Sequence, residues 1–304
     1  MKKISVGRMD SLPFDQKYFS AFESSLEKAL FTGDESLKPL YDAMRYTAAG
    51  GGKRLRAGLV FGFYEAAGGE DAFSPADYAA AVELIHAASL IHDDLPVMDD
   101  DDYRRGKLTN HKVYGEDFAL IAGDALFIKA FETAAKNPHC GETQNLRAVS
   151  VLARAAGPDG MAGGQMLDIS FSLKNGGKAQ LKKTHLLKTA SLISASCALG
   201  CVAAGADEEQ ILAAEEYGKS LGLAFQIYDD ILDVTGSKTD MGKTPGKDEK
   251  QRKLTYPALY GLENSRAMCG EYTKKAVDSL FAFKNTPALQ KLKCLAERLL
   301  ERKS

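Results

Sequence analysis

The sequence predicts an all-α fold, on three observations. Apolar residues recur at intervals of three and four in almost every stretch between glycine or proline breaks, as on one face of a helix. No run combines sustained apolar and polar alternation with β-branched side chains, so we expect no sheet. No repeat, linker or low-complexity segment divides the 304 residues. We therefore expect one domain over residues 1–304, a helix bundle around one large cavity.

The breaks in the helical pattern place the expected helices in order. Glycines interrupt the pattern at 50–52 and 68–69, Asn137-Pro138 ends a long helix, and a glycine-rich bend is expected over residues 157–164. A capping signal at Ser74-Pro75 predicts another helix start. The expected helices span residues 16–31, 39–49, 53–67, 75–92, 117–136, 144–156, 180–204, 208–234, 255–262, 265–283 and 287–302.

Composition and charge exclude several classes of function. A net charge of −2 argues against a general nucleic-acid binder. The five cysteines form no CxxC pair, which is typical of free thiols in a reducing cytoplasm. The first residues lack the apolar core of a signal peptide, and the most apolar stretch, 189–206, is rich in small residues, as in a buried helix. We expect a cytoplasmic protein with no stable membrane insertion.

An acidic cluster occupies the stretch LIHDDLPVMDDDDYRRGKLTN, residues 90–110. Pro96 disfavours helix at the residue before it, so Asp93 and Asp94 lie at a helix end. A helix C-terminus is already electronegative, so these carboxylates need a cation to offset them. Taken alone, such an acidic run is usually a solvated loop.

A second acidic cluster, Asp229, Asp230 and Asp233 in FQIYDDILD, changes that interpretation. Asp229 and Asp233 are four residues apart and share one helix face. Two acidic clusters with apolar flanks, far apart in sequence, are typical of two walls of one metal site. Carboxylate ligands without His or Cys favour Mg²⁺ or Mn²⁺, which completes its coordination with water and substrate phosphates.

These motifs resemble those of the trans-prenyl diphosphate synthases of the short-chain farnesyl and geranylgeranyl type. The first motif, DDxxxxD, begins at Asp93 and is followed by RRG at 104–106, and the second, DDxxD, begins at Asp229. The match extends from GGKRLR at Gly51 to TYPAL at Thr255. The resemblance implies an orthogonal helix bundle of the isoprenoid synthase type and a homodimer. It also implies Mg²⁺-dependent condensation of isopentenyl diphosphate with an allylic diphosphate, with no nucleic-acid partner.

The resemblance assigns site residues in three groups, and it counts Asp93, Asp94, Asp99, Asp229, Arg104, Lys188 and Lys243 as catalytic. The metal ligands are Asp93, Asp94, Asp99, Asp229 and Asp233. The groups that hold isopentenyl diphosphate are Lys53, Arg56, His86 and Arg105. The groups that hold the allylic diphosphate are Arg104, Lys188, Thr189, Gln226, Lys243 and Lys253. GGQMLD at 163–168 also matches, but the roles of Gln165 and Asp168 cannot be read from the residues.

The chemistry accounts for these residue types. A diphosphate leaves once metal and Arg or Lys groups neutralise its charge. The allylic cation that remains needs an apolar pocket that excludes water. The double bond of isopentenyl diphosphate attacks the cation, and by family resemblance the departing diphosphate takes the proton.

Product length is predicted from the helix that ends at Asp93. Enzymes of this type that stop at fifteen carbons often carry an aromatic residue five positions before the first Asp, and Ala88 stands there. Ser89 lies about one turn, 5.4 Å, before Asp93, and Leu84 and Ile85 lie further down. We therefore expect geranylgeranyl diphosphate, with farnesyl diphosphate as the alternative.

Three other functions remain as competing hypotheses. A class I terpene cyclase shares the fold, but its second metal motif usually mixes Asn or Asp with Ser, Thr and Glu. A non-catalytic subunit of a heterodimeric synthase tends to lose its Asp motifs, and both are whole here. A calcium-binding structural protein would lack the Lys and Arg clusters, and no EF-hand loop is present.

Overall fold

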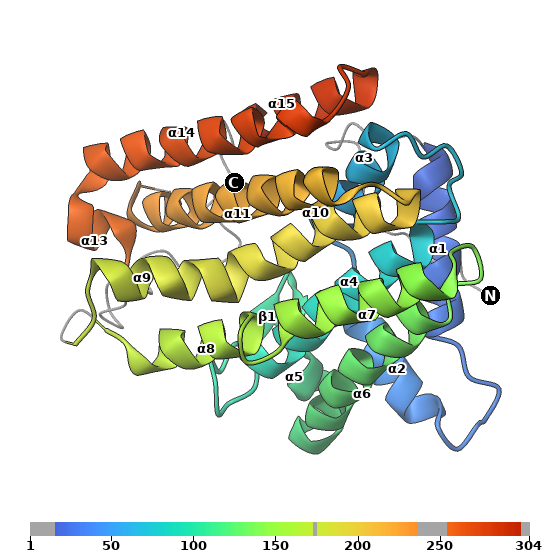
Figure 1. Ribbon diagram of the computed structural model, residues 1–304. Helices are drawn as coiled ribbons and strands as arrows, with labels where there is room; N and C mark the ends of the chain where they lie inside the picture. The colour runs from blue at the N-terminus through green and yellow to red at the C-terminus, as the bar shows by residue number, and fades with distance from the viewer. Residues whose placement is uncertain (1–15, 173–174, 236–253, 299–304) are drawn as a thin grey trace. The chain divides into compact units, whose positions relative to one another are not determined.

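The structure is a computed structural model that describes residues 16–172, 175–235 and 254–298. Its helices confirm the all-α fold (Figure 1). Internal contacts divide the chain into two compact units. The first unit comprises residues 1–61 and 70–149, and the second comprises residues 62–69 and 150–304. The single domain and the large cavity stay predictions.

The first unit is built around one largely buried helix. This helix, α4 (Ala76–Asp93), packs against α1 (Gln16–Ala29), α2 (Lys38–Ala48) and α6 (Glu116–Ala135). Its core positions, Ala79 to Val82 among them, are fully buried, because neighbours cover it on several sides. The unit also holds α5 (Asn110–Tyr114), while α3 (Leu55–Ala66) and α7 (Glu142–Ala156) continue into the second unit.

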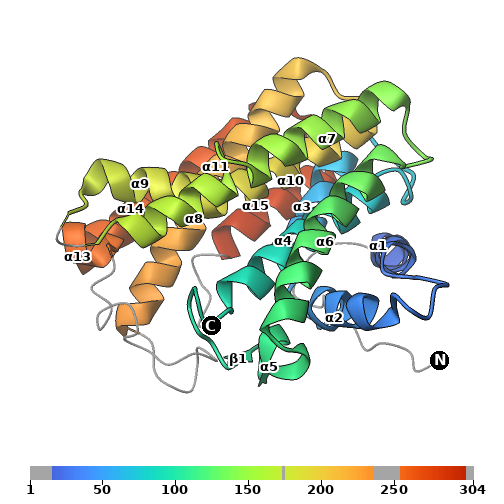
Figure 2. The ribbon, with the colours of Figure 1, turned by 90° about the horizontal axis from the view of Figure 1, so that it is seen from below.

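The second unit is organised around α11 (Glu208–Thr235), which packs against α10 (Ser191–Ala204) and α14 (Leu262–Asp278). These helices run side by side in both views (Figures 1 and 2). A Cβ atom at Gly222 would lie 2.5 Å from the Cα of Ala190, so glycine permits the close approach. The unit also contains α8 (Met161–Ser170), α9 (Lys178–His185), the π-helical segment η1 (Leu186–Ala190), α13 (Tyr256–Tyr260), the 3₁₀ segment η2 (Ser279–Ala282) and α15 (Pro287–Arg298).

Several local features differ from the prediction. A short antiparallel hairpin pairs β1 (Tyr103–Arg104) with β2 (Lys107–Leu108), where no strand was expected. Its strands are too short to show a period of two. Helix α8 begins at Met161, inside the predicted glycine-rich bend. The predicted helix cap at Ser74 was wrong. The N-cap of α4 is Pro75, without a side-chain cap bond, and the Ser74 hydroxyl donates to the Asp71 carboxylate instead.

The predicted buried helix is confirmed. Residues 178–204 form the one stretch of the described chain that is long and apolar enough to cross a membrane, and 78% of its apolar window is buried. Such burial is typical of the core helix of a folded unit. All five cysteines are free, as predicted.

Candidate active site

The first acidic motif lies where α4 ends. Asp93 is the last residue of α4, and Asp94 is its C-cap. The Asp99 N–H donates to the Asp93 carbonyl at 2.9 Å, so the loop folds back onto the helix end. Asp93 and Asp99 are partly exposed, whereas Asp94 is only 3% exposed. The two carboxylates of the DD pair therefore have different surroundings.

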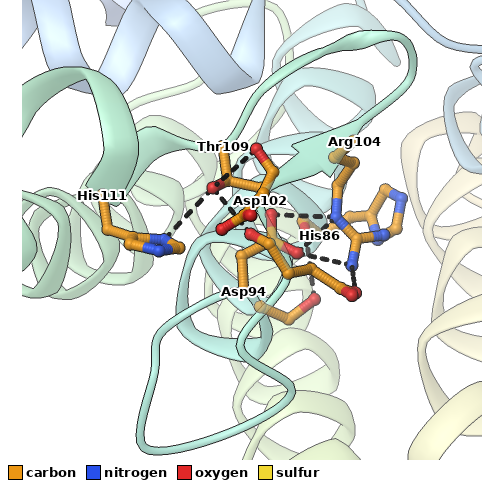
Figure 3. A network of polar contacts seen from close by, with 8 residues as sticks. His86, Asp94, Asp102, Arg104, Thr109 and His111 are labelled. Carbon is orange, nitrogen blue, oxygen red and sulfur yellow. Dashed lines mark hydrogen bonds and ion pairs between the residues drawn. The ribbon is translucent and has the colours of Figure 1, made fainter.

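Arg104 supplies the cation that the helix end requires. Its Nε donates to both Asp94 oxygens, at 2.7 and 2.9 Å, and its Nη2 lies 2.6 Å from Asp94 Oδ1 (Figure 3). Such a multidentate pair is among the strongest side-chain contacts. Burial alone would lower the pKa of Arg104, but the contacts with Asp94 raise it overall. The prediction that a cation offsets the carboxylates at this helix end is confirmed for Asp94.

A buried ion pair ties the glycine loop to α4. Arg54 Nη1 lies 3.0 Å from Glu83 Oε2, and its Nη2 donates to the Ala48 carbonyl at 2.7 Å. Glu83 also accepts from the Ala57 N–H at 3.2 Å. Arg54 and Glu83 are both nearly fully buried, so breaking the pair would leave an uncompensated charge. Arg54 therefore has a structural role. Sequence analysis did not identify Glu83, although a carboxylate on an apolar helix signals a buried partner.

Two of the cations predicted to hold isopentenyl diphosphate, Arg56 and Arg105, lie near His86 in the first unit. Burial, and then the charges of Arg56 and Arg105, lower the pKa of His86 well below 6.5, so its imidazole is neutral at pH 7. The Arg56 Nε is buried and has no hydrogen-bond partner in the described part of the chain. A Cβ at Gly52 would lie 2.8 Å from the Arg105 guanidinium, so the glycine loop leaves room for that side chain. Lys53 lies exposed in the same loop.

The residues predicted to set product length lie on α4, next to His86 in sequence. Leu84, Ile85 and Ala88 are 0% exposed. The Ser89 hydroxyl donates to the His86 carbonyl at 2.9 Å. Phe127 of α6 lies near the same helix, with its ring centroid 5.8 Å from that of His92.

In the second unit, Lys188 and Thr189 lie on the π-helical segment. Such segments often occur at functional sites. Lys188 Nζ lies 2.6 Å from Asp168 Oδ2. A Cβ at Gly164 would lie 2.1 Å from the Lys188 nitrogen, so glycine lets α8 approach closely. These two contacts explain the GGQMLD motif, whose glycine and aspartate position Lys188.

The other allylic-side residues form a chain of hydrogen bonds in the second unit. Thr189 Oγ1 donates to Gln226 Oε1 at 2.8 Å, and Gln226 Nε2 donates to Asp230 Oδ1 at 3.3 Å. The Tyr256 N–H donates to Asp230 Oδ2 at 2.9 Å, which ties TYPAL to the acidic motif. His185 is buried beside them, 3.9 Å from Asp230. Lys243 and Lys253 lie outside the described residues.

The second acidic motif, like the first, combines one buried aspartate with two partly exposed ones. Asp230 is 4% exposed and accepts hydrogen bonds from the protein, whereas Asp229 and Asp233 are partly exposed on α11. Within the described part of either unit, no three His, Cys, Asp or Glu side chains converge closely enough to hold a metal ion by themselves. The oxygen-only donor set nevertheless fits a hard divalent cation that completes its shell with water and phosphate.

The sequence and the fold are similar to those of known proteins. The pattern of the polyprenyl synthetase family matches residues 37–297. Geranylgeranyl pyrophosphate synthase 9, chloroplastic, of Arabidopsis thaliana is 45% identical over 278 residues, which cover 89% of this chain and 77% of that protein. The heterodimeric geranylgeranyl pyrophosphate synthase large subunit 1, chloroplastic, of the same plant is 45% identical over 85% of this chain and 71% of its own.

A solved structure extends the similarity to the fold. The polyprenyl synthase of Caulobacter crescentus, complexed with calcium and isoprenyl diphosphate, matches with a TM-score of 0.86 and 28% identity, covering 99% of each chain. The fold is therefore that of the all-α isoprenoid synthases, which confirms the fold class. The chain belongs to the polyprenyl synthetase family and is a prenyltransferase that acts on diphosphate substrates. Enzymes of this family use a divalent metal to bind diphosphate.

Proposed function

We propose that the enzyme condenses isopentenyl diphosphate with allylic diphosphates, using Mg²⁺, to give geranylgeranyl diphosphate. One observation carries the proposal: an acidic motif lies beside a cluster of arginines around a neutral histidine in the first unit. That combination suits a diphosphate and its metal together. The relative named as a geranylgeranyl pyrophosphate synthase supports this product.

By the family resemblance, the metal ligands would be the partly exposed carboxylates of each acidic motif: Asp93 and Asp99 in the first unit, and Asp229 and Asp233 in the second. Bound there, it would neutralise the leaving diphosphate. Asp94 was also predicted as a metal ligand. Its carboxylate accepts hydrogen bonds from Arg104, so we propose that Asp94 instead orients the side chain of that arginine. The solved relative with calcium and isoprenyl diphosphate supports joint binding of a cation and a diphosphate.

The protein side chains bind and orient the two substrates. Lys53, Arg56, His86 and Arg105 hold isopentenyl diphosphate, with the neutral His86 acting as an N–H donor. By the family resemblance, we assign the allylic diphosphate to Arg104 in the first unit and to Lys188, Thr189 and Gln226 in the second, with Lys243 and Lys253 outside the described residues. The allylic C–O bond breaks, and the isopentenyl double bond attacks the resulting cation to form the new C–C bond. The departing diphosphate then removes a proton from the cationic adduct, which restores a double bond.

One assay tests the proposal. Purified protein is incubated with Mg²⁺, isopentenyl diphosphate and, separately, dimethylallyl, geranyl or farnesyl diphosphate, and products are sized by mass spectrometry. We expect a twenty-carbon diphosphate. Activity should vanish with EDTA and return with Mg²⁺ or Mn²⁺, because the ligands are oxygen-only. Full turnover in EDTA would refute the metal assignment, and a fifteen-carbon end product would establish the farnesyl alternative.

We further propose a homodimer. The exposed face of α6 carries an apolar stripe, defined as Phe118, Ile121 and Ile128, which are 41%, 54% and 70% exposed. Their spacing places them on one helix face, and exposed apolar patches of this kind mark interaction surfaces. The similar large subunit of a heterodimeric synthase makes an unlike partner the alternative.

We also propose a cytoplasmic location, supported by the five free thiols. Two similar plant proteins are named chloroplastic, so a plastid is the alternative. Imaging of a fluorescent fusion of the full chain in its native cell separates the two.

A further inference from the structure

The hairpin β1–β2 places Arg104 and Arg105, yet it cannot be stable by itself. Each strand has two residues, and an isolated hairpin is marginal in water even when longer. The turn residues, Arg105 and Gly106, have φ values of +54° and +74°, the signature of a type I′ turn. An arginine at positive φ is strained, so contacts from outside the hairpin must hold this conformation.

Thr109 provides the first of these contacts, at the base of the hairpin. Its N–H donates to the Asp102 carbonyl at 2.9 Å, and its hydroxyl donates to the Asp101 carbonyl at 2.8 Å. Thr109 is also the N-cap of α5, where a threonine hydroxyl ordinarily accepts from the first helical turn. Here the hydroxyl makes no cap bond and reaches back to the acidic loop instead. Thr109 therefore joins the loop after Asp99 to the start of α5.

His111 fixes the direction of that hydroxyl. Its Nδ1 lies 3.2 Å from Thr109 Oγ1 (Figure 3). Its Nε2 is buried and has no hydrogen-bond partner among the described residues. This arrangement assigns the proton to Nδ1, which donates to the hydroxyl while the hydroxyl donates to Asp101. Thr109 is 2% exposed, so water does not compete for these bonds.

Tyr46 provides a second contact, on strand β2. Its hydroxyl, which comes from α2, donates to the Leu108 carbonyl at 2.7 Å. Its ring also packs edge-on against Tyr114 of α5, with centroids 5.7 Å apart. Arg105 itself donates to the Gly51 carbonyl.

We propose that Thr109 and Tyr46 are positioning residues that hold the hairpin, and with it Arg104 and Arg105, in the geometry that grips diphosphate. Neither side chain is expected to touch substrate or metal. The proposal rests on the proposed function of these arginines. Removing the partners that orient metal ligands typically costs roughly ten- to a hundred-fold in affinity or activity, and we expect a loss of the same order here.

The test uses residues 1–304 as one chain, with three test variants and one control variant. Thr109→Val removes the hydroxyl and keeps nearly the same side-chain shape, whereas Thr109→Ser keeps the hydroxyl. Tyr46→Phe removes the hydrogen bond to the Leu108 carbonyl. Thr273→Val is the matched control, because Thr273 is 4% exposed and its hydroxyl bonds only its own helix, at the Cys269 carbonyl. Binding of inorganic pyrophosphate with Mg²⁺ is measured by calorimetry, and hydrogen exchange is followed over residues 101–109.

We expect Thr109→Val to accelerate exchange over residues 101–109 and to weaken pyrophosphate binding about tenfold or more. Thr109→Ser should remain close to wild type, and Tyr46→Phe should show a smaller change in the same direction. If Thr109→Val and Thr273→Val exchange and bind alike, the proposal is overturned. If Thr109→Val does not fold, Tyr46→Phe decides, and an unchanged hairpin and affinity overturn the proposal.

The same experiment separates this proposal from the proposed function. Accelerated exchange in Thr109→Val, with a wild type that neither binds pyrophosphate nor makes product, would establish the contacts but refute the function. An active wild type whose Thr109→Val variant is indistinguishable from it would refute the positioning role alone.

Discussion

At the scale of single residues, the two proposed diphosphate sites make different predictions. Arg56→Ala should mainly raise the KM for isopentenyl diphosphate, and Lys188→Ala should mainly raise the KM for the allylic substrate. Each change removes one charge-assisted contact to phosphate, worth on the order of 1.5–3 kcal/mol. Steady-state kinetics with each substrate varied in turn measures both effects. If both variants raised the KM of the same substrate alone, the assignment of the two sites would be wrong.

His185 carries a second prediction, on stability against pH. Burial lowers its pKa to about 4, from an ordinary value of 6.5. As pH falls, the unfolded chain therefore takes up this proton before the folded chain does. The group's contribution is present above pH 6.5 and is lost progressively as pH falls toward 4. The loss amounts to at most about 3 kcal/mol.

Urea unfolding at several pH values between 7.5 and 4.5 measures this loss. His185→Gln should flatten the pH dependence of the unfolding free energy, whereas the exposed His139, changed to Gln, should leave it as in wild type. An unchanged slope in His185→Gln would show that other groups carry the pH dependence.

Sequence analysis assigned candidate residues mainly where a charge has an obvious chemical task. It placed Asp93, Arg104 and Lys188 in the site, and the structure adds the contacts that orient them. It did not single out Glu83, Thr109 or Tyr46, because their importance lies in partners 26 to 62 residues away or in backbone carbonyls. Such pairings are properties of the fold and leave no local signal.

At the scale of elements, the period of apolar residues predicted the long helices well, to within a few residues at each end. It did not predict the π-helical segment, because Gln180 to Ala204 reads as one continuous helix. The irregular segment lies where the chain packs most closely: Gly164 and Gly222 bring α8 and α11 within van der Waals distance of the backbone at 188 and 190. The hairpin was missed because its turn places an arginine where glycine or asparagine is usual.

Helix α4 carries a prediction about product length. Ala88 is fully buried five residues before Asp93, so a larger side chain there should shorten the space along the helix. Ala88→Tyr should reduce the main product by about one isoprene unit, while Leu84→Ala should lengthen it or broaden the distribution. Mass spectrometry of products from a mixed substrate assay measures both. Stability must be checked in parallel, because overpacking a core site costs about 1–3 kcal/mol.

Two outcomes together would show that the limit on product length is set by another helix. If wild type stops at fifteen carbons and Ala88→Tyr changes nothing, another helix closes the pocket. Phe127 and Phe131 of α6 are then the residues to change, because Phe127 lies against the same end of α4. Phe127→Ala should in that case lengthen the product where Leu84→Ala does not.

At the scale of the whole molecule, the α6 stripe predicts self-association. Burying an exposed isoleucine contributes about 1.5–3 kcal/mol, and a symmetric interface uses each one twice. Ile121→Glu combined with Ile128→Glu should therefore convert the dimer to a monomer, as measured by light scattering after size exclusion. Leu212→Glu is the control, since Leu212 is 57% exposed on α11 and lies outside the stripe. A double variant that remains dimeric would assign the interface to another surface, and a fully active wild-type monomer would refute the dimer itself.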